Sequence, residues 1–260
     1  MNTFLKLAVV KVKGEQSDIV DESIITEYPL KLYVNDKEFN TFYCTPKDLK
    51  ELAVGYLMSC GVLGGKQDVL SIEIIEKKNS AKIRIAEQMT RPQKEPLENP
   101  MAIKIQTIYQ IMGKNVKPTE LFMETGGFHS VAIYDGDQEV ITIMDVARHN
   151  AVDKVIGYCI INDIDCRDKI LVVSGRISSD MISKAEKGSI PVVLSKSAPT
   201  SLSISRADEA GITLVGFVRG EQMNVYTHPN RIDLGEETFR AIVKKKRTNY
   251  LRNSFLYLRS

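Results

Sequence analysis

The feature that most limits the fold is an alternation of short apolar runs and helical patterns in the second half of the sequence. Hairpin, helix, strand, helix, strand, helix and strand patterns follow one another at residues 129–144, 150–162, 170–173, 179–187, 191–194, 201–210 and 212–218. Strand–helix–strand units form right-handed crossovers and parallel strands with helices packed on the sheet. The alternation therefore predicts an α/β domain with a mostly parallel sheet.

The first hundred residues show a different pattern of predicted strands and helices. Strand patterns occupy residues 4–12, 30–34, 38–44, 69–76 and 81–86. One helical pattern lies among them, and we expect it to begin with Thr45 as N-cap and Pro46 in the first position, and to end near Gly61. Strands with a single helix indicate a small mixed α+β unit.

A boundary between two domains is expected where the sequence becomes rich in proline. Residues 88–100, QMTRPQKEPLENP, hold three prolines and many charges, which predicts a loop, and a short helical pattern follows at 103–112. We predict a small mixed α+β domain over residues 1–102, an α/β domain over 103–235 and a basic extension over 236–260.

Composition excludes several classes of protein. Hydrophobic residues make up 43% and charged residues 26% of the chain, and no apolar run of about 18 residues is present, so no membrane span is expected. Lysines interrupt the apolar N-terminal segment, which indicates a strand rather than a signal peptide and a cytoplasmic location. Residues 236–260 carry seven Lys or Arg against two Glu and leave a net negative body, which does not favour nucleic-acid binding. We expect this extension to be a solvated or partner-contacting helix, with a weak contact to an acidic partner or a membrane surface as the alternative.

Motifs for several kinds of catalysis are absent from the sequence. It contains no GxSxG elbow, no P-loop, no GxGxxG after a strand and no cysteine and histidine pattern for a deaminase zinc. Its four cysteines include no CxxC pair, so we expect reduced, structural thiols and no metal site. What remains is a binding site without an obvious nucleophile.

Loops at one edge of the predicted sheet carry groups suited to an anion. In an open α/β sheet, ligands bind beyond the carboxyl ends of the strands, beside helix N-termini. The loops expected there are DVARHN (145–150), SGRIS (174–178), SKSAPTS (195–201), FVRGEQ (217–222) and, brought back by the hairpin, TGGFH (125–129). They hold Arg148, Arg176 and Arg219, with both histidines of the region, and arginine suits bidentate phosphate contact. The edge predicts a cleft for a phosphorylated, nucleotide-like ligand.

Each of these residues also has a plainer explanation. Asn150 with Asp153 forms a good N-cap pair, and Thr200 or Ser201 can cap the helix that follows. A single histidine is more often structural, and a single glycine is most often a turn residue. The functional interpretation depends on all of them meeting at one edge.

The chain resembles a known family over most of its length. The run PLKLYVNDKEFNTFYCTPKDLKELAVGYLMSCGVL, then TGGFHSVAIYD, DVARHNAVDKVIG, VVSGRISSDMISKA, SKSAPTSLSISRADEAGITLVGFVRG and MNVYTHPNRI, is similar in order to the formate dehydrogenase accessory protein family, FdhD/NarQ. The resemblance covers about residues 25–232 and implies a cytidine-deaminase-like three-layer α/β/α domain without zinc, joined to the smaller domain in a homodimer. It also implies transfer of persulfide sulfur from a cysteine desulfurase to the bis-molybdopterin guanine dinucleotide cofactor of formate dehydrogenase, with GDP as a fragment ligand.

The sequence departs from the family at the sulfur-carrying loop, which normally reads like SSCGxCG. The corresponding residues 88–100 contain no cysteine, although a thiolate is what takes up and passes on sulfane sulfur. A smaller departure is Ala147, where the family usually has glycine. Three hypotheses stay open: an accessory protein that supports cofactor sulfuration, a non-catalytic cofactor or guanine-nucleotide chaperone or regulator, and a structural role without a ligand.

The loops and the resemblance together give the set of expected cofactor contacts. These are Thr125, Gly126, Gly127, His129, Arg148, His149, Asn150, Lys154, Ser174, Gly175, Arg176, Ser197, Pro199, Thr200, Phe217, Val218, Arg219, Gly220, Glu221 and Gln222.

Overall fold

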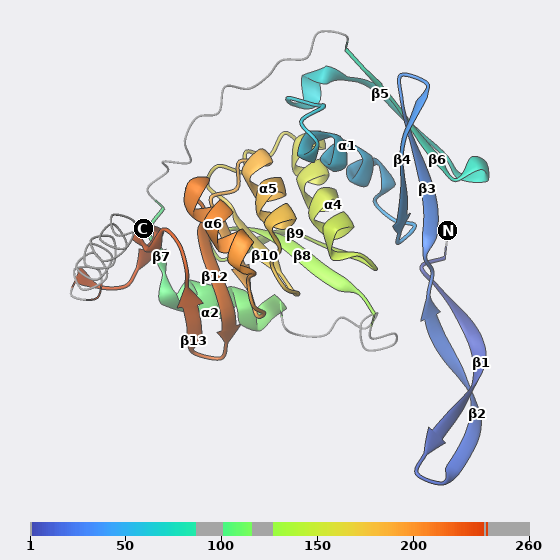
Figure 1. Ribbon diagram of the computed structural model, residues 1–260, viewed down its shortest axis with the longest axis horizontal. Coiled ribbons are helices and arrows are strands. Elements are labelled where there is room, and N and C mark those ends of the chain that lie inside the picture. The colour runs from blue at the N-terminus through green and yellow to red at the C-terminus, as the bar shows by residue number, and fades with distance from the viewer. Residues whose placement is uncertain (1, 87–100, 116–126, 237, 239–260) are drawn as a thin grey trace, which may run out of the picture.

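A six-stranded sheet forms the centre of the molecule, with a four-stranded sheet beside it and a two-stranded ribbon beyond (Figure 1). The computed structural model describes residues 2–86, 101–115, 127–236 and 238. The loop expected at 88–100 and nearly all of the extension expected at 236–260 lie outside the described residues. No helix in the described ranges is long and apolar enough to cross a membrane.

The six-stranded sheet is mixed rather than mostly parallel, so that prediction was wrong. Its order is β13-β12-β11-β10-β8-β9. Its strands are β8 (His129–Asp135), β9 (Gln138–Asp145), β10 (Ile170–Val173), β11 (Val192–Ser195), β12 (Thr213–Arg219) and β13 (Gln222–Val225). Only β10, β11 and β12 pair in parallel. Tight hairpin turns join β8 to β9 and β12 to β13, and such turns require antiparallel neighbours. The sequence pattern missed β13.

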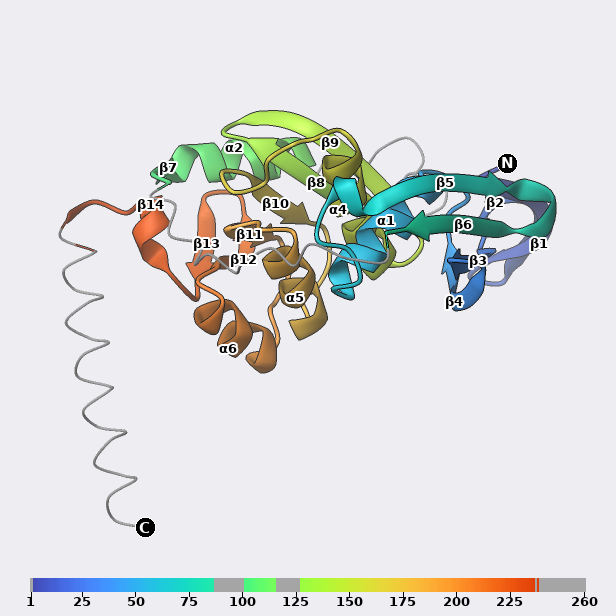
Figure 2. The same ribbon diagram turned by 90° about the horizontal axis from the view of Figure 1, so that it is seen from above.

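Helices cover both faces of this sheet (Figure 2). One face packs against α4 (Arg148–Ile161), α5 (Ser179–Lys187) and α6 (Ser201–Glu209), and the other against α2 (Ile105–Asn115). Because side chains alternate along a strand, Leu171 and Val173 join the first core, and Ile170 and Val172 join the second. The α/β class and its three layers are therefore as predicted, while the likeness to cytidine deaminases stays a prediction. Strand β7 (Ile103–Lys104) directly precedes α2 and pairs with β14 (Ile232–Asp233) near the end of the described chain.

The smaller sheet has the order β4-β3-β6-β5 and packs against α1 (Leu49–Ser59). Its strands are β3 (Tyr28–Val34), β4 (Lys37–Cys44), β5 (Val69–Ile75) and β6 (Ser80–Ile85). Helix α1 begins later than expected, with Asp48 rather than Thr45 at its N-cap. Thr45 is instead only 2% exposed, and its hydroxyl accepts a hydrogen bond from the Val146 N–H at 3.1 Å. The mixed α+β character is as expected, and the boundary at residue 102 stays a prediction.

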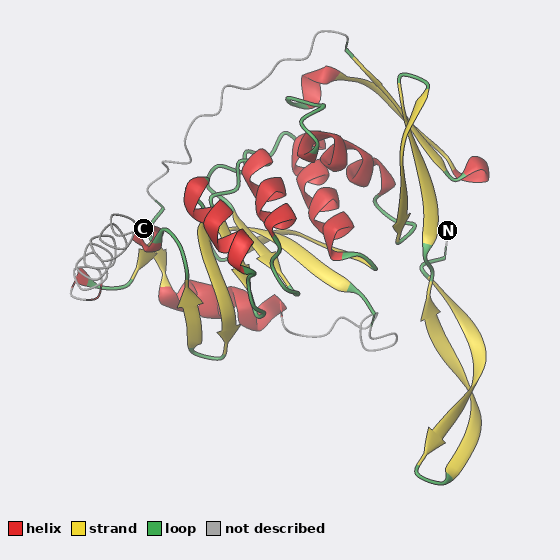
Figure 3. Cartoon of the chain, viewed as in Figure 1, coloured by secondary structure: helices red, strands yellow, loops and turns green. Residues whose placement is uncertain are grey.

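A ribbon of two long strands extends the small sheet (Figure 3). Strand β1 (Phe4–Lys13) pairs with β2 (Gln16–Ile25) in an unbroken antiparallel register. The sequence pattern missed β2, because its apolar residues do not alternate and Asp, Glu and Ser lie among them. Neither strand belongs to the two larger sheets.

Helices α1 and α4 pack against each other at an unusually short distance and so join the two larger sheets. A Cβ atom placed on Gly55 would lie 1.8 Å from the Asp153 carbonyl oxygen, and one on Gly157 would lie 1.9 Å from that of Glu51. Only glycine allows two helix backbones to approach this closely. This contact fixes the small sheet to the helix that begins at the predicted binding edge.

Candidate functional site

The loops that the sequence places at one sheet edge do meet there, and we call this edge the rim. His129 at the start of β8 pairs with Asp145 at the end of β9, so the two ends of the first hairpin lie side by side. The loops after β10, β11 and β12 open at the same edge, where α4, α5 and α6 begin (Figure 1).

Backbone hydrogen bonds tie the three later loops together. The Ile177 N–H donates to the Ala198 carbonyl at 3.1 Å, and the Thr200 N–H donates to the Ile177 carbonyl at 3.0 Å. The Phe217 N–H donates to the Ser197 carbonyl at 3.2 Å, and the buried Ser195 hydroxyl donates to the Gly175 carbonyl at 2.7 Å. The rim is therefore a set of cross-linked loops rather than independent ones.

Arg148 lies beside His129 and Gly175 with an unused donor. A Cβ atom on Gly175 would lie 3.4 Å from His129 Nδ1 and 3.8 Å from Arg148 Cδ, so the absent side chain leaves room for both. Arg148 Nε is buried and has no hydrogen-bond partner within the described residues. A buried donor without a partner is costly unless a ligand or water completes it.

The N-termini of α4 and α5 are also left open at the rim. Ala147 caps α4 and Ser178 caps α5, and neither side chain makes a capping hydrogen bond, whereas the Thr200 hydroxyl accepts from the Ser203 N–H in α6. The predicted capping by Asn150 was wrong, because α4 begins two residues earlier and Asn150 Nδ2 donates to the Tyr43 carbonyl at 2.9 Å. Uncapped helix N-termini attract anions through their free N–H groups and their dipole.

Both rim histidines are held towards the neutral form. Burial, helped by the positive charge of Arg148, lowers the pKa of His129. Burial also lowers the pKa of His149, although Asp180 opposes the shift. His149 Nε2 lies 3.4 Å from the Ser178 hydroxyl and 3.7 Å from Asp180 Oδ2. Because the same nitrogen faces both groups, this geometry is not that of a serine–histidine–carboxylate relay.

Phe217 and Arg219 form the outer part of the rim at a β-bulge in β12. Phe217 has a positive φ of 53°, which is strained for this residue type, and the residue is 37% exposed. Arg219 lies over that ring with its guanidinium carbon 5.6 Å from the centroid, and its Nε donates to the Lys196 carbonyl at 3.0 Å. The pair presents an aromatic face and a cation together.

Two of the expected contacts lie beneath the rim rather than on it. Lys154 is fully buried, lies 2.6 Å from Asp145 Oδ2 and donates to the Thr45 carbonyl at 3.0 Å. Val218 is 1% exposed and packs in the core beside α2. Asp145 also accepts from the Thr45 N–H at 3.1 Å, so Lys154 belongs to a junction that holds the small sheet to the start of α4.

The remaining expected contacts divide by position. Thr125 and Gly126 lie outside the described residues, and Gly220 forms the turn between β12 and β13 with a φ of 56°. Ser174 accepts from the Ser130 N–H at 3.0 Å, and Pro199 forms a bridge with Ile177. The exposed ones among these residues are Gly127, Arg176, Thr200, Gly220, Glu221 and Gln222. Sequence patterns carried no sign of the bonds between Thr45 and the segment Asp145–Val146, because these bonds join residues about 100 positions apart.

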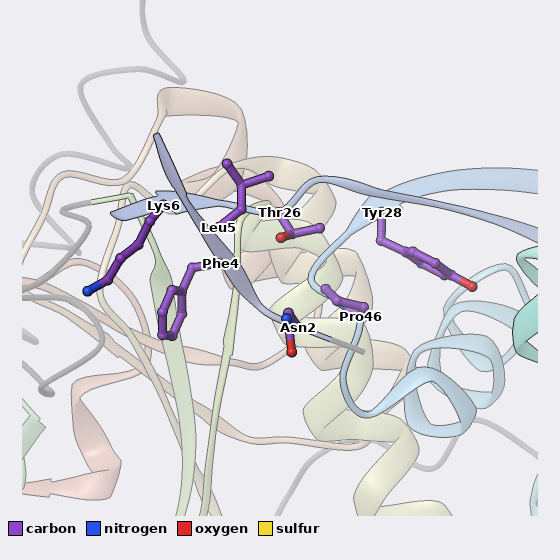
Figure 4. A pocket seen from close by; sticks show the side chains of 7 residues that line it. All are labelled: Asn2, Phe4, Leu5, Lys6, Thr26, Tyr28 and Pro46. Atoms are coloured by element: carbon purple, nitrogen blue, oxygen red, sulfur yellow. The ribbon is translucent and has the colours of Figure 1, made fainter. Parts of the chain in front are cut away.

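The expected cleft at the rim stays a prediction, and one cavity of the structure lies elsewhere (Figure 4). That cavity, of about 700 Å³, lies at the base of the ribbon and is lined by Tyr28 and Pro46 among others. No group of three or more potential metal ligands occurs in the described part of the chain.

None of the four cysteines lies among the rim residues. Cys44, Cys159 and Cys166 are buried, and Cys60 at the end of α1 is exposed. Burial raises the pKa of Cys44 to about 12 and also raises the pKa of Cys60. A raised pKa leaves little thiolate at neutral pH, so neither thiol is an activated nucleophile.

Comparison with known proteins settles the family. The model of the FdhD/NarQ family matches residues 25–99 and 85–233. The chain belongs to the FdhD/NarQ family. A member from Bacillus pumilus (strain SAFR-032), named sulfur carrier protein FdhD, is 37% identical over 238 residues, which cover 81% of this chain and 90% of the relative.

Two further proteins show how far the likeness extends. The protein of the same name from Bacillus subtilis (strain 168) is 35% identical over 246 residues, covering 84% of this chain and 94% of the relative. A crystal structure from Desulfotalea psychrophila, provisionally described as a formate dehydrogenase accessory protein, has a TM-score of 0.80 at 24% identity and covers 89% of this chain and all of the other. This structural likeness shows that the two proteins share a fold over 89% of this chain.

Proposed function

We propose that this FdhD/NarQ member is a cytoplasmic formate dehydrogenase accessory protein that binds the bis-molybdopterin guanine dinucleotide cofactor at the rim and supports its sulfuration. The observation that carries the proposal is the buried Arg148 Nε, which lacks a partner in the described residues and lies beside two uncapped helix N-termini. A phosphate oxygen is the acceptor that all of these donors favour. The names of the curated relatives and their sulfur chemistry support the choice of client.

The rim suits a nucleotide better than a free phosphate. Phe217 and Arg219 can contact the base by stacking and by cation attraction, while Arg148 and the starts of α4 and α5 hold phosphate oxygens. The cofactor is the client, and its two guanine dinucleotide arms supply both kinds of group.

Calorimetry with GDP tests the rim. Arg148→Ala is expected to weaken GDP binding by roughly 10- to 100-fold, because a hydrogen bond to a charged group contributes about 1.5–3 kcal/mol. Arg84→Ala is the matched control, since Arg84 is exposed on the small sheet, where its weak contact is with Asp36. No GDP binding at millimolar concentration, or equal affinities for both variants, would remove the assignment.

The cysteine positions favour a second candidate, a cofactor chaperone that does not relay sulfur itself. Residues 88–100 contain no cysteine, and Cys60 is the only exposed one of the four. A relay needs a thiolate that accepts sulfane sulfur from a cysteine desulfurase. The two candidates share the rim and differ in this one step.

Complementation separates the two candidates. The wild type and Cys60→Ser are expressed in a strain that lacks its own accessory protein, with formate dehydrogenase activity as the readout. Persulfide on the purified protein after incubation with a desulfurase, together with loss of rescue in Cys60→Ser, would establish the relay. Rescue by both proteins without any persulfide would establish the chaperone, and no rescue by either would reject both.

A further inference from the structure

Asn150 makes contacts outside its own helix. It lies in the first turn of α4, and its Nδ2 donates to the Tyr43 carbonyl at 2.9 Å and to Asp145 Oδ1 at 3.3 Å. Tyr43 belongs to β4, so this side chain joins the start of α4 to the edge of the small sheet (Figure 1). A side chain that only capped a helix would bond within that helix.

The start of α4 has no cap of its own. Ala147 occupies the N-cap position, and an alanine side chain accepts no hydrogen bond. Helix ends fray, and their first N–H groups need partners from outside the helix. On one side of Arg148, Asp145 Oδ1 accepts from the Ala147 N–H at 2.8 Å. On the other side, Asn150 is fixed to β4, so Arg148 lies between two residues that are held from outside the helix.

The end of β4 is a firm anchor, because Thr45 is bonded to the segment around the start of α4 in both directions. Its N–H donates to Asp145 Oδ2 at 3.1 Å, and its hydroxyl accepts from the Val146 N–H at 3.1 Å. Its carbonyl accepts from the buried Lys154 Nζ at 3.0 Å. Donors and acceptors of both segments are thus paired with each other, so the edge of the small sheet and the start of α4 are expected to move as one unit.

The side chain of Arg148 depends on this framework for its place. Its Cδ would lie 3.8 Å from a Cβ atom on Gly175, and its buried Nε has no partner among the described residues. An unpaired donor does not fix its own side chain, so the backbone around Arg148 sets its position. We propose that Asn150 is a positioning residue, which holds Arg148 at the rim by tying it to the small sheet and does not contact the ligand itself. This rests on the proposed function, in which Arg148 binds a phosphate.

His129 reports the position of Arg148 without any ligand. Burial lowers the pKa of His129, the positive charge of Arg148 lowers it further, and Asp145 opposes the shift. Movement of Arg148 away from the imidazole removes part of this effect, so the pKa of His129 should rise. A loss of stability alone leaves this pKa unchanged in the folded protein. The pKa therefore separates positioning from a general structural role.

NMR titration of the histidines and calorimetry with GDP, both on the intact protein, test the proposal. Asn150→Ala is expected to raise the pKa of His129, as Arg148→Ala does, and to weaken GDP binding roughly 3- to 10-fold, which is the effect of one hydrogen bond. The matched control is Asn162→Ala at the other end of α4. Asn162 Nδ2 donates to the Tyr158 carbonyl at 2.9 Å, so the control removes the same kind of bond. It should leave both values unchanged.

Where the wild type binds GDP, the proposal requires both changes in Asn150→Ala. Equal values in Asn150→Ala and Asn162→Ala overturn it. Weaker binding with an unchanged pKa of His129 also overturns it, because Asn150 would then contact the ligand directly. A raised pKa with unchanged affinity overturns it as well, because binding would not depend on the position of Arg148. If the wild type does not bind GDP, the proposed ligand is rejected, and the pKa alone decides the positioning role.

Thr45→Val gives the same test from the small sheet if Asn150→Ala does not fold. It removes the acceptor of the Val146 N–H and keeps the size of a side chain that is 2% exposed. Thr45 is too deeply buried to touch a ligand, so the expected rise in the pKa of His129 and the weaker GDP binding would come through the framework. No change in either value would overturn the proposal.

Discussion

Helix α4 contributes to two regions that differ in whether their buried polar groups have hydrogen-bond partners. Where it meets the small sheet, Lys154 pairs with Asp145, and Asp153 accepts from Lys184 and Ser59. At its start on the rim, Arg148 keeps a buried Nε without a partner in the described residues. Lys154, whose ammonium group has structural partners, thus lies six positions after Arg148, whose Nε has none among the described residues.

The difference lies in what covers each group. Lys154 and Asp153 are enclosed by α1, α5 and the Thr45 turn, so their charges need partners within the chain. Arg148 lies beside Gly175 and His129, and its Nε has no partner among the described residues. Whether a charged side chain near a site has a structural or a ligand-binding role is therefore judged from its partners and not from its residue type.

The largest expected effect comes from breaking the junction. Lys154→Met leaves Asp145 buried without its cation, and removing one partner of a buried ion pair costs about 3–5 kcal/mol. Urea denaturation measures the loss. Lys154→Met with Asp145→Asn is the control, because removing both charges should restore part of the stability. A Lys154→Met protein that unfolds like the wild type but binds GDP poorly would show that Lys154 acts in ligand binding and not in the junction.

The next effect comes from the crossing of α1 and α4. Gly157→Ala places a methyl group 1.9 Å from the Glu51 carbonyl oxygen, so the helices must separate. Overpacking against backbone is expected to cost about 3 kcal/mol in the free energy of unfolding. Gly113→Ala in α2 is the matched control, since nothing lies within 4 Å of the added carbon. Equal stabilities would show that the helices shift without cost.

The sequence predicted the rim better than it predicted the junction. Hairpin pairing and strand–helix alternation follow from local patterns, so the meeting of His129 with the DVARHN segment could be inferred. Lys154 could not be assigned, because its partners Thr45 and Asp145 come from different sheets. The late start of α1 also results from a contact distant in sequence. The Thr45 hydroxyl could have capped the helix, but it accepts a hydrogen bond from the Val146 N–H instead.

The pH dependence of stability sharpens the contrast at the rim itself. Burial lowers the pKa of His129 and of His149, so the unfolded chain binds protons more readily than the folded one. Stability is therefore expected to fall as pH drops below the unfolded value of about 6.5, and the loss is expected to be small because both side chains are partly exposed and screened by solvent. A bound phosphate favours the protonated histidines and should reduce this fall.

Thermal unfolding between pH 5.5 and 8 with and without GDP measures both effects. His228→Gln is the control, because His228 lies outside the rim, 3.6 Å from Asp208. The dependence should persist in His228→Gln and weaken in His129→Gln. The same pH dependence in all three proteins would mean that the rim histidines do not take up the protons.

The smallest expected effect is the difference in stability lost when the N-cap residue is changed in a capped helix and in an uncapped one. Thr200→Ala removes the acceptor for the Ser203 N–H and should cost about 1 kcal/mol of stability. Ser178→Ala should cost less, since Ser178 makes no capping hydrogen bond in α5. GDP affinity should change little in Thr200→Ala, because α6 satisfies its own end. A large loss of affinity in Thr200→Ala at near wild-type stability would move the anion site from α4 and α5 towards α6.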